Sequence, residues 1–305
     1  MCPFGGSLIS GRGSVFDAAE MVCHCLLIET DDGLVLVDTG FGRGDVARPA
    51  RLGAAFRALT RPRLSAADTA IAQIEALGFS ARDVRHIAVT HLDLDHAGGL
   101  SDFPSARVHL LHDEHAAAMH PPTLAEKNRY RAEQWAHGPR WELHRPDGER
   151  WFGFERVRAI GKTDDEVLLI PLVGHTRGHA AVAVRTPSGW LLHGGDAYFF
   201  HGELADPPVC PTGLHLFQTL VAVDDRARRA NRDRLRELVR DHGSEVQVFS
   251  AHDPVELARM RAESVEATAS RLPRRGECDV AFLALHGGSG EDGTIQALLD
   301  LAGVP

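Results

Sequence analysis

The chain has 305 residues, of which 44% are hydrophobic and 25% charged, and its formal net charge is −9. This is the composition of an ordinary globular protein with a sizeable core. The negative charge argues against nucleic acid or an anionic membrane as partner, and no apolar run reaches the roughly 18–20 residues of a membrane span. The N-terminus lacks the pattern of a secretory signal, and the five cysteines are scattered. We therefore expect a cytoplasmic, reducing location.

Apolar patterning predicts that strands and helices alternate along most of the chain. The first two strands flank the turn-forming residues Asp31 to Gly33 and predict a hairpin, whereas 40–65 has no clear assignment. The predicted strands are 22–30, 34–38, 84–90, 107–112, 167–173, 179–186, 190–195 and 246–250, and the predicted helices are 66–78, 224–242 and 254 to about 270. This alternation predicts an α/β or α+β class with layered sheets.

Residues 113–150 depart from this alternation. They are polar, interrupted by proline and comparatively rich in aromatic residues, which predicts a helical insertion. Four of them combine cationic with aromatic character, as a cap over a pocket would: Arg129, Tyr130, Arg131 and Trp135.

Polar side chains gather where the predicted strands end. Residues 90–99, THLDLDHAGG, directly follow a buried strand and hold two imidazoles and two carboxylates, which are costly to bury without a cation. Further candidates follow later strands, in the GHTRGH run at 174–179, at Asp196 and at His252. Imidazole and carboxylate ligands that converge from separate strand ends are typical of a metal site.

Cys23, His24 and Cys25 also look like a metal motif, but they lie inside an apolar strand. Alternation with a period of two places both thiols on one face of that strand and His24 on the other. Because free cysteine is often buried, we interpret both thiols as core residues.

Taken together, the strand-end motifs resemble those of the metallo-β-lactamase superfamily. The Leu-Val-Asp38-Thr-Gly hairpin, an HxHxDH-type loop, GHTxGH, the strand-end Asp196 and the late His252 occur in order across residues 22–252. The resemblance implies a four-layer αββα sandwich in a catalytic domain at 1–270, with a dinuclear metal site at one edge.

The resemblance also implies a role for each matching position. The implied ligands of two divalent metal ions are His91, Asp93 and His179 for the first, Asp95, His96 and His252 for the second, and Asp196 as the bridge. Asp38 would orient a ligand, and His175 would support the site without binding metal.

Asp93 stands where the family has its second histidine. A carboxylate adds negative charge there and shifts the preference of the first site from zinc towards iron or manganese. The flavodiiron branch also has a carboxylate at this place, although no flavin domain is visible here. Zinc is the favoured metal, and iron and manganese remain alternatives. Another alternative is that the first site binds metal weakly, which would leave the enzyme effectively mononuclear.

Divalent cations in such a site lower the pKa of bound water, which supplies a hydroxide nucleophile, and polarise a substrate carbonyl. We expect Asp95 to steer the nucleophile and carry its proton. Tyr198 could donate to a developing oxyanion, or form only the aromatic wall of the pocket. Phe199 and Phe200 favour an apolar lining.

The whole pattern looks most like the lactonase branch of the superfamily. We therefore expect a small-molecule substrate, a lactone or related ester of the N-acyl homoserine lactone type. Thioesterase, arylesterase, phosphotriesterase and β-lactamase activities remain alternatives, and a non-haem iron oxidoreductase is the alternative from another class. A homodimer is left open.

Residues 278–305 resemble a strand–loop–helix piece of the N-terminal region of D-alanine–D-alanine ligases, mainly through LHGGSGEDGTIQ. No ATP-grasp nucleotide-binding domain accompanies them, so ligase activity is not expected. We predict that 271–305 form an appended strand and helix without an assigned function.

Overall fold

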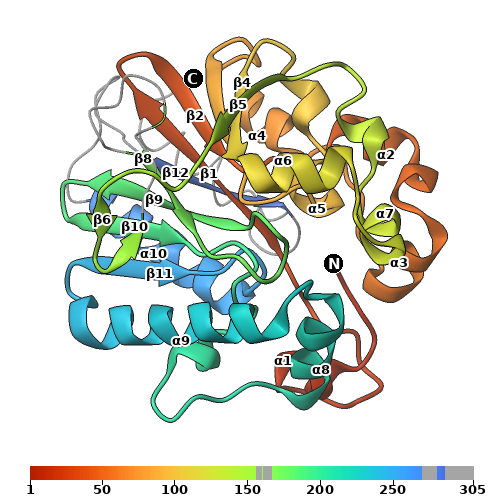
Figure 1. The fold of residues 1–305 in the computed structure, drawn as a ribbon, viewed down its shortest axis with the longest axis vertical. Helices are drawn as coiled ribbons and strands as arrows, with labels where there is room; N and C mark the ends of the chain where they lie inside the picture. Colours follow the sequence, from red (N-terminus) through yellow and green to blue (C-terminus); the bar gives the residue numbers. More distant parts are fainter. Residues whose placement is uncertain (156–159, 161–166, 270–279, 286–305) are drawn as a thin grey trace.

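The computed structural model describes residues 1–155, 160, 167–269 and 280–285. Two sheets lie face to face within this part of the chain, and helices cover their outer sides (Figure 1). The predicted αββα sandwich is therefore confirmed. No helix in the described ranges combines the length and the apolar character that crossing a membrane requires.

The first sheet has six strands, and most of it is parallel. Its order is β12 (Val280–Leu285), β1 (Cys23–Thr30), β2 (Gly33–Val37), β3 (Val84–Ala88), β4 (Arg107–Leu111) and β5 (Arg140–His144). β1 is antiparallel to both of its neighbours, and β2 to β5 run parallel. The predicted hairpin is β1–β2.

The second sheet has four strands, in the order β11 (Val246–Phe249), β10 (Gly189–His193), β9 (Ala180–Thr186) and β8 (Val167–Pro171). Its outer side is covered by α9 (Asp225–His242), the long helix at the bottom of Figure 1. The Asp224 side chain caps α9 by accepting a hydrogen bond from the Ala227 amide at 2.9 Å. α10 (Pro254–Ala269) follows β11.

Alternation along the strands divides the core into layers. On β2, Val35 and Val37 point between the sheets and pack in one cluster with Val182 of β9. Leu34 and Leu36 point outward to α4 (Ala70–Ala76), which buries Ile71 and Ile74. The outer face of the second sheet packs in the same way against Leu235 and Leu238 of α9.

Several short helices were not predicted, because they lack a long periodic apolar face. They are α1 (Gly6–Ser10), α2 (Arg43–Ala47), α3 (Ala54–Thr60), α5 (Leu94–Ala97), α8 (Thr212–Val221) and the 3₁₀ turns Pro49–Leu52, Leu100–Asp102, Ala132–Gln134 and His201–Leu204. α2 to α3 fill most of the unassigned stretch at 40–65. α1 and α8 contact each other at the lower right of Figure 1.

The segment at 113–150 is only partly an insertion. It contains α6 (His112–Met119) and α7 (Leu124–Arg129), as expected for a helical element, but β5 then joins the first sheet as an edge strand. A small hairpin of β6 (Arg150–Trp151) and β7 (Phe154–Glu155) follows. Within 113–150, only the helices α6 and α7 could therefore act as a cap over a pocket, because β5 is part of the first sheet.

The strand predicted in the C-terminal tail is β12. It pairs antiparallel with β1, from Cys23 opposite Leu285 to Ile28 opposite Val280. The helix that we predicted after it lies outside the described residues.

Candidate metal centre

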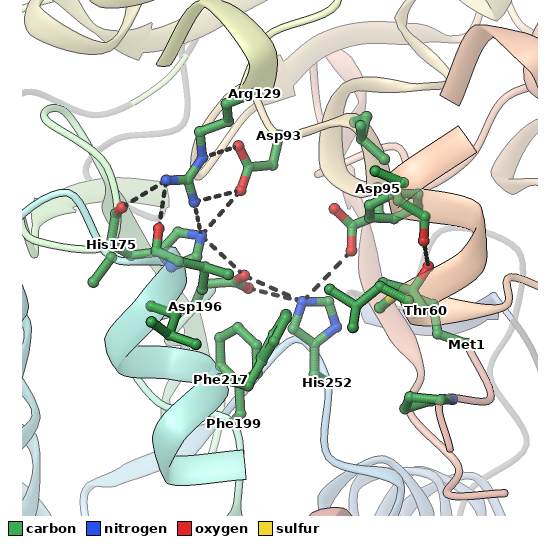
Figure 2. A pocket seen from close by; sticks show the side chains of 18 of the residues that line it. Met1, Thr60, Asp93, Asp95, Arg129, His175, Asp196, Phe199, Phe217 and His252 are labelled. Atoms are coloured by element: carbon green, nitrogen blue, oxygen red, sulfur yellow. Dashed lines mark hydrogen bonds and ion pairs between the residues drawn. The ribbon is translucent and has the colours of Figure 1, made fainter. Parts of the chain in front are cut away.

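The polar segments at the strand ends meet at one edge of the sandwich. The segment after β3 supplies His91 to His96, and those after β8, β10 and β11 supply His175, Asp196 and His252. They border a pocket of about 1070 Å³. Figure 2 shows Asp93 and His175 on one side of the pocket, Asp95 and His252 on the other, and Asp196 between them.

The first group of metal-binding atoms comprises Nε2 of His91 and His175 and Oδ2 of Asp93 and Asp196. His175 Nε2 lies 3.0 Å from the Asp93 oxygen and 3.3 Å from the Asp196 oxygen. His91 Nε2 lies 3.3 Å and 3.7 Å from the same two atoms. Ligands at 2.0–2.1 Å in a tetrahedron are ~3.3 Å apart, so this group has suitable dimensions for one zinc-sized cation.

The second group lies on the other side of Asp196. The Nε2 atoms of His96 and His252 are 3.2 Å and 3.1 Å from Asp196 Oδ1, and 3.4 Å from each other. Asp95 forms an adjoining cluster with Cys23 and His252, its Oδ2 lies 3.7 Å from His252 Nε2, and we count it with the second group because both clusters share His252. Asp196 Oδ2 is also 3.2 Å from His252 Nε2, so the Asp196 carboxylate lies between the two groups, as a bridging ligand would.

Two buried atoms in these groups, His91 Nε2 and Asp196 Oδ1, make no hydrogen bond of regular geometry in the part of the chain described, although two imidazole nitrogens lie within 3.2 Å of Asp196 Oδ1. Buried polar atoms are normally satisfied, since leaving them unpaired destabilises the fold. A cation in each group would satisfy the atom that belongs to it. The donor set thus fits divalent metal ions.

The other nitrogen of several imidazoles is held by the protein, so that Nε2 faces the site. Asp38 accepts hydrogen bonds from His96 Nδ1 at 2.8 Å and from the Thr90 amide at 2.7 Å. His252 Nδ1 is 2.7 Å from the carbonyl oxygen of Val22. Such contacts fix the tautomer and the ring orientation of a metal-binding histidine, and Asp38 lies where the orienting residue is expected.

The charges of the site depend on one another. Burial on its own would raise the pKa of Asp196, but the nearby imidazoles of His252 and His96 hold it well below its usual value. Burial opposes protonation of His96 and His252, yet Asp196 raises the pKa of both rings well above normal. Since metal ligands must be deprotonated, a cation that binds here would displace these protons.

The two histidines of the GHTRGH run do not lie as we expected. His175 Nε2 belongs to the first group of metal-binding atoms, whereas His179 lies outside both groups. Both ring nitrogens of His179 are already engaged, with the Leu172 carbonyl at 3.0 Å and the Asp196 amide at 2.9 Å. The geometry therefore favours His175 as the ligand and His179 as the support for Asp196.

Gly195 is required by this support. Its φ is +54°, and an added Cβ would lie 2.6 Å from His179 Nε2. A side chain at this position would be strained and would push His179 away from the Asp196 amide.

Tyr198 does not reach the pocket. Its ring is fully buried, and its hydroxyl donates to the Glu256 carboxylate, with oxygen–oxygen distances of 3.0 Å and 3.1 Å. Burial raises the pKa of Glu256 to about 8, and it also raises the pKa of Tyr198 well above its usual value. The oxyanion role that we considered for Tyr198 has no support in this geometry, and neither does the pocket-rim position.

Replacing Tyr198 with phenylalanine is therefore expected to leave kcat/KM within about twofold of the wild type. It should lower the free energy of unfolding by about 1–2 kcal/mol, because Glu256 loses a buried donor. Steady-state kinetics and urea unfolding would measure the two effects. A loss of activity of 100-fold with unchanged stability would restore Tyr198 to the catalytic site.

Sequence reasoning set aside one possible ligand, Cys23, as a core residue. Its thiol lies within 4.8 Å of a carboxylate oxygen of Asp95 and a ring nitrogen of His252. Cys23 does pack in the core, as predicted, but it is the first residue of β1. Because β1 is antiparallel to β2, with Leu26 opposite Val37, its start lies beside the strand end that carries Asp38. This register was the available signal.

The walls of the pocket away from the polar edge are mainly apolar. Phe199 and Phe217 lie next to His252 (Figure 2), and Leu59, Leu216 and Leu220 line the pocket although more than half of each residue is exposed. Phe200 is not among the lining residues. An apolar chain on a substrate could cover this surface.

The sequence matches a family model described as Metallo-beta-lactamase superfamily over residues 19–244. A second model, described as D-ala D-ala ligase N-terminus, matches residues 217–305. A probable metallo-hydrolase of Mycobacterium tuberculosis is 46% identical over 241 residues, which are 78% of this chain and 77% of the relative. An N-acyl homoserine lactonase of a Bacillus species is 24% identical over 61% of this chain and 67% of the relative.

Solved structures resemble the fold. An N-acyl homoserine lactone hydrolase with the product N-hexanoyl-L-homoserine at its catalytic metal centre superposes with a TM-score of 0.63 and 22% identity, over 86% of this chain and 92% of the other. AidC, a dizinc quorum-quenching lactonase, gives a TM-score of 0.55 and 18% identity, over 83% of this chain and 84% of AidC.

Proposed function

Since this chain belongs to the metallo-beta-lactamase superfamily and is a metallo-hydrolase, we propose that it opens lactones or related carboxylic esters that carry an apolar acyl chain. N-acyl homoserine lactones are the class to test first, because distant relatives bear that activity in their names. The observation that carries the proposal is a carboxylate, Asp196, which joins two groups of metal-binding atoms at the end of an apolar pocket.

The proposed cofactor is a pair of divalent cations. The first would be held by His91, Asp93 and His175, the second by Asp95, His96 and His252, and Asp196 would contribute to both. Imidazole nitrogens and carboxylate oxygens are suitable ligands for zinc. Bound cations would supply activation of water and polarisation of the substrate carbonyl.

The chain's own residues would supply position and proton transfer. Phe199 and Phe217 would bind the acyl chain, so that the ester carbonyl lies beside Asp196. We assign to the Asp95 carboxylate the transfer of a proton from the attacking water to the oxygen of the leaving alkoxide. Water adds to the carbonyl carbon, the ring C–O bond breaks, and a hydroxy acid forms and releases one proton.

This release of protons is the measurement that tests the function. We expect metal-loaded protein to acidify a weakly buffered solution of N-decanoyl homoserine lactone, and chelated protein to be inactive. Activity should return when metal is restored. Because the walls are apolar, kcat/KM should be about tenfold or more higher for the decanoyl than for the butanoyl substrate, since each buried CH₂ contributes ~0.8 kcal/mol.

The open-ring N-decanoyl homoserine is the matched control and should give no acidification. Protein that carries both metals and still leaves the lactone intact would contradict the proposed substrate class. Thioesters, aryl esters, phosphotriesters and β-lactams would then be tested on the same preparation, and oxygen consumption if the bound metal is iron.

A further inference from the structure

We propose that Arg129 makes the first group the weaker of the two metal sites, by competing with the cation for Asp93 and His175. The proposal rests on the metal site of the proposed function, but it concerns binding of metal and not the choice of substrate. It assigns to a residue of α7 the control of how many metal ions the protein holds at a given concentration.

The guanidinium of Arg129 binds the same atoms that would hold the first cation. Its Nε donates to Asp93 Oδ1 at 2.5 Å and its Nη2 to Asp93 Oδ2 at 2.7 Å. Nη2 is also 2.7 Å from Nε2 of His175. Asp93 Oδ2 and His175 Nε2 are two of the four ligand atoms of the first group, so a cation and Arg129 would contend for both (Figure 2).

The Arg129 guanidinium stays charged, and hydrogen bonds hold it beside Asp93 and His175. A guanidinium stays protonated in proteins, and two of its nitrogens are held by the Asp93 carboxylate. Its Nη1 donates to the carbonyl oxygens of Val221 at 2.7 Å and of His175 at 3.1 Å. These contacts join α7 to α8 and to the loop after β8, and they hold the guanidinium in the pocket.

The second group has no such competitor. In the described ranges, the hydrogen bonds and ion pairs of Asp95, His96 and His252 involve no arginine or lysine. Cys23 instead offers this group an additional soft donor. A fixed positive charge thus acts on one site only, and the two sites should differ in affinity for the same metal.

Titration of metal-free protein with Zn²⁺ tests this, with bound metal counted by elemental analysis and affinity measured against a competing chelator. We expect the wild type to bind one equivalent tightly and a second at least about tenfold more weakly. Arg129→Gln removes the charge but keeps a hydrogen-bond donor, and should tighten the weaker step by at least about tenfold, since two charges ~4 Å apart interact strongly even near a surface.

Two further variants test whether the positive charge of Arg129, and not merely the loss of an arginine from the pocket, weakens metal binding. Arg129→Lys keeps a positive charge beside Asp93, and should keep the second step weak. Arg177→Gln is the matched control, because Arg177 also lines the pocket but pairs with Glu126, and both affinities should stay at the wild-type values. Circular dichroism and thermal unfolding of each variant would show that the fold is kept.

Two equal, tight equivalents in the wild type would overturn the proposal, whether or not the variants fold. Weaker binding in Arg129→Gln would also overturn it, because Arg129 would then support the ligands. The titration uses no substrate. An inactive protein with the expected titration would therefore contradict only the proposed substrate, and an active lactonase with two equal sites only the role of Arg129.

Discussion

Replacing Asp196 with alanine is expected to remove metal from both groups and to lower kcat/KM by at least about 1,000-fold. This is the upper end of the loss seen when one group that stabilises the transition state electrostatically is removed. Its carboxylate lies between the two groups, with Oδ2 3.3 Å from His175 Nε2 and Oδ1 3.1 Å from His252 Nε2. No other carboxylate in the described site contacts both groups. Elemental analysis after gel filtration and hydrolysis kinetics would measure the two losses.

The fold should survive this change, because the Asp196 backbone amide still donates to His179. Asp241→Ala is a suitable control, since it removes an exposed carboxylate that forms an ion pair with Arg240 and lies outside the pocket lining. An Asp196→Ala protein that keeps two metals would contradict the bridging role. An Asp196→Ala protein that keeps one metal would show that only one of the two groups requires Asp196 to bind its cation.

Substitution of His175 and His179 is expected to give two different kinds of loss. His175→Ala should lose about one equivalent of metal and at least about 100-fold in kcat/KM, with little change in the fold. His179→Ala should instead lower the free energy of unfolding by about 2–4 kcal/mol, because two buried hydrogen bonds lose a partner.

Metal content per folded chain decides between the two histidines. The folded fraction of His179→Ala should still bind two equivalents, since its ring lies outside both groups of metal-binding atoms. The opposite pattern, with His179→Ala deficient in metal and His175→Ala fully loaded, would restore the assignment that the sequence motif suggested.

The sequence was sufficient to predict the layers and the place of the site. The continuous apolar runs of β2 and β9 indicate strands that are covered on both faces, and the polar residues after β3, β10 and β11 mark the ends of strands that lie near one another. These features are local, so they can be read from neighbouring residues along the chain.

The remaining features depend on how distant segments pack. His175 and His179 have the same side chain in the same short loop, and only the path of that loop decides which ring faces Asp93. Arg129 reaches Asp93 from a helix 36 residues further along the chain. Tyr198 follows Asp196 closely, yet the turn between them directs it to Glu256. No local pattern encodes these directions.

The metal-binding atoms are divided between the two sheets. His91, Asp95 and His96 follow a strand of the first sheet, whereas His175, Asp196 and His252 follow strands of the second. A cation bound to both sets would cross-link the two layers, and its binding energy would become part of the stability of the sandwich. At a free metal concentration 1,000 times the dissociation constant, one such ion adds about 4 kcal/mol. Metal supply would then govern how much of the protein is folded as well as how much is active.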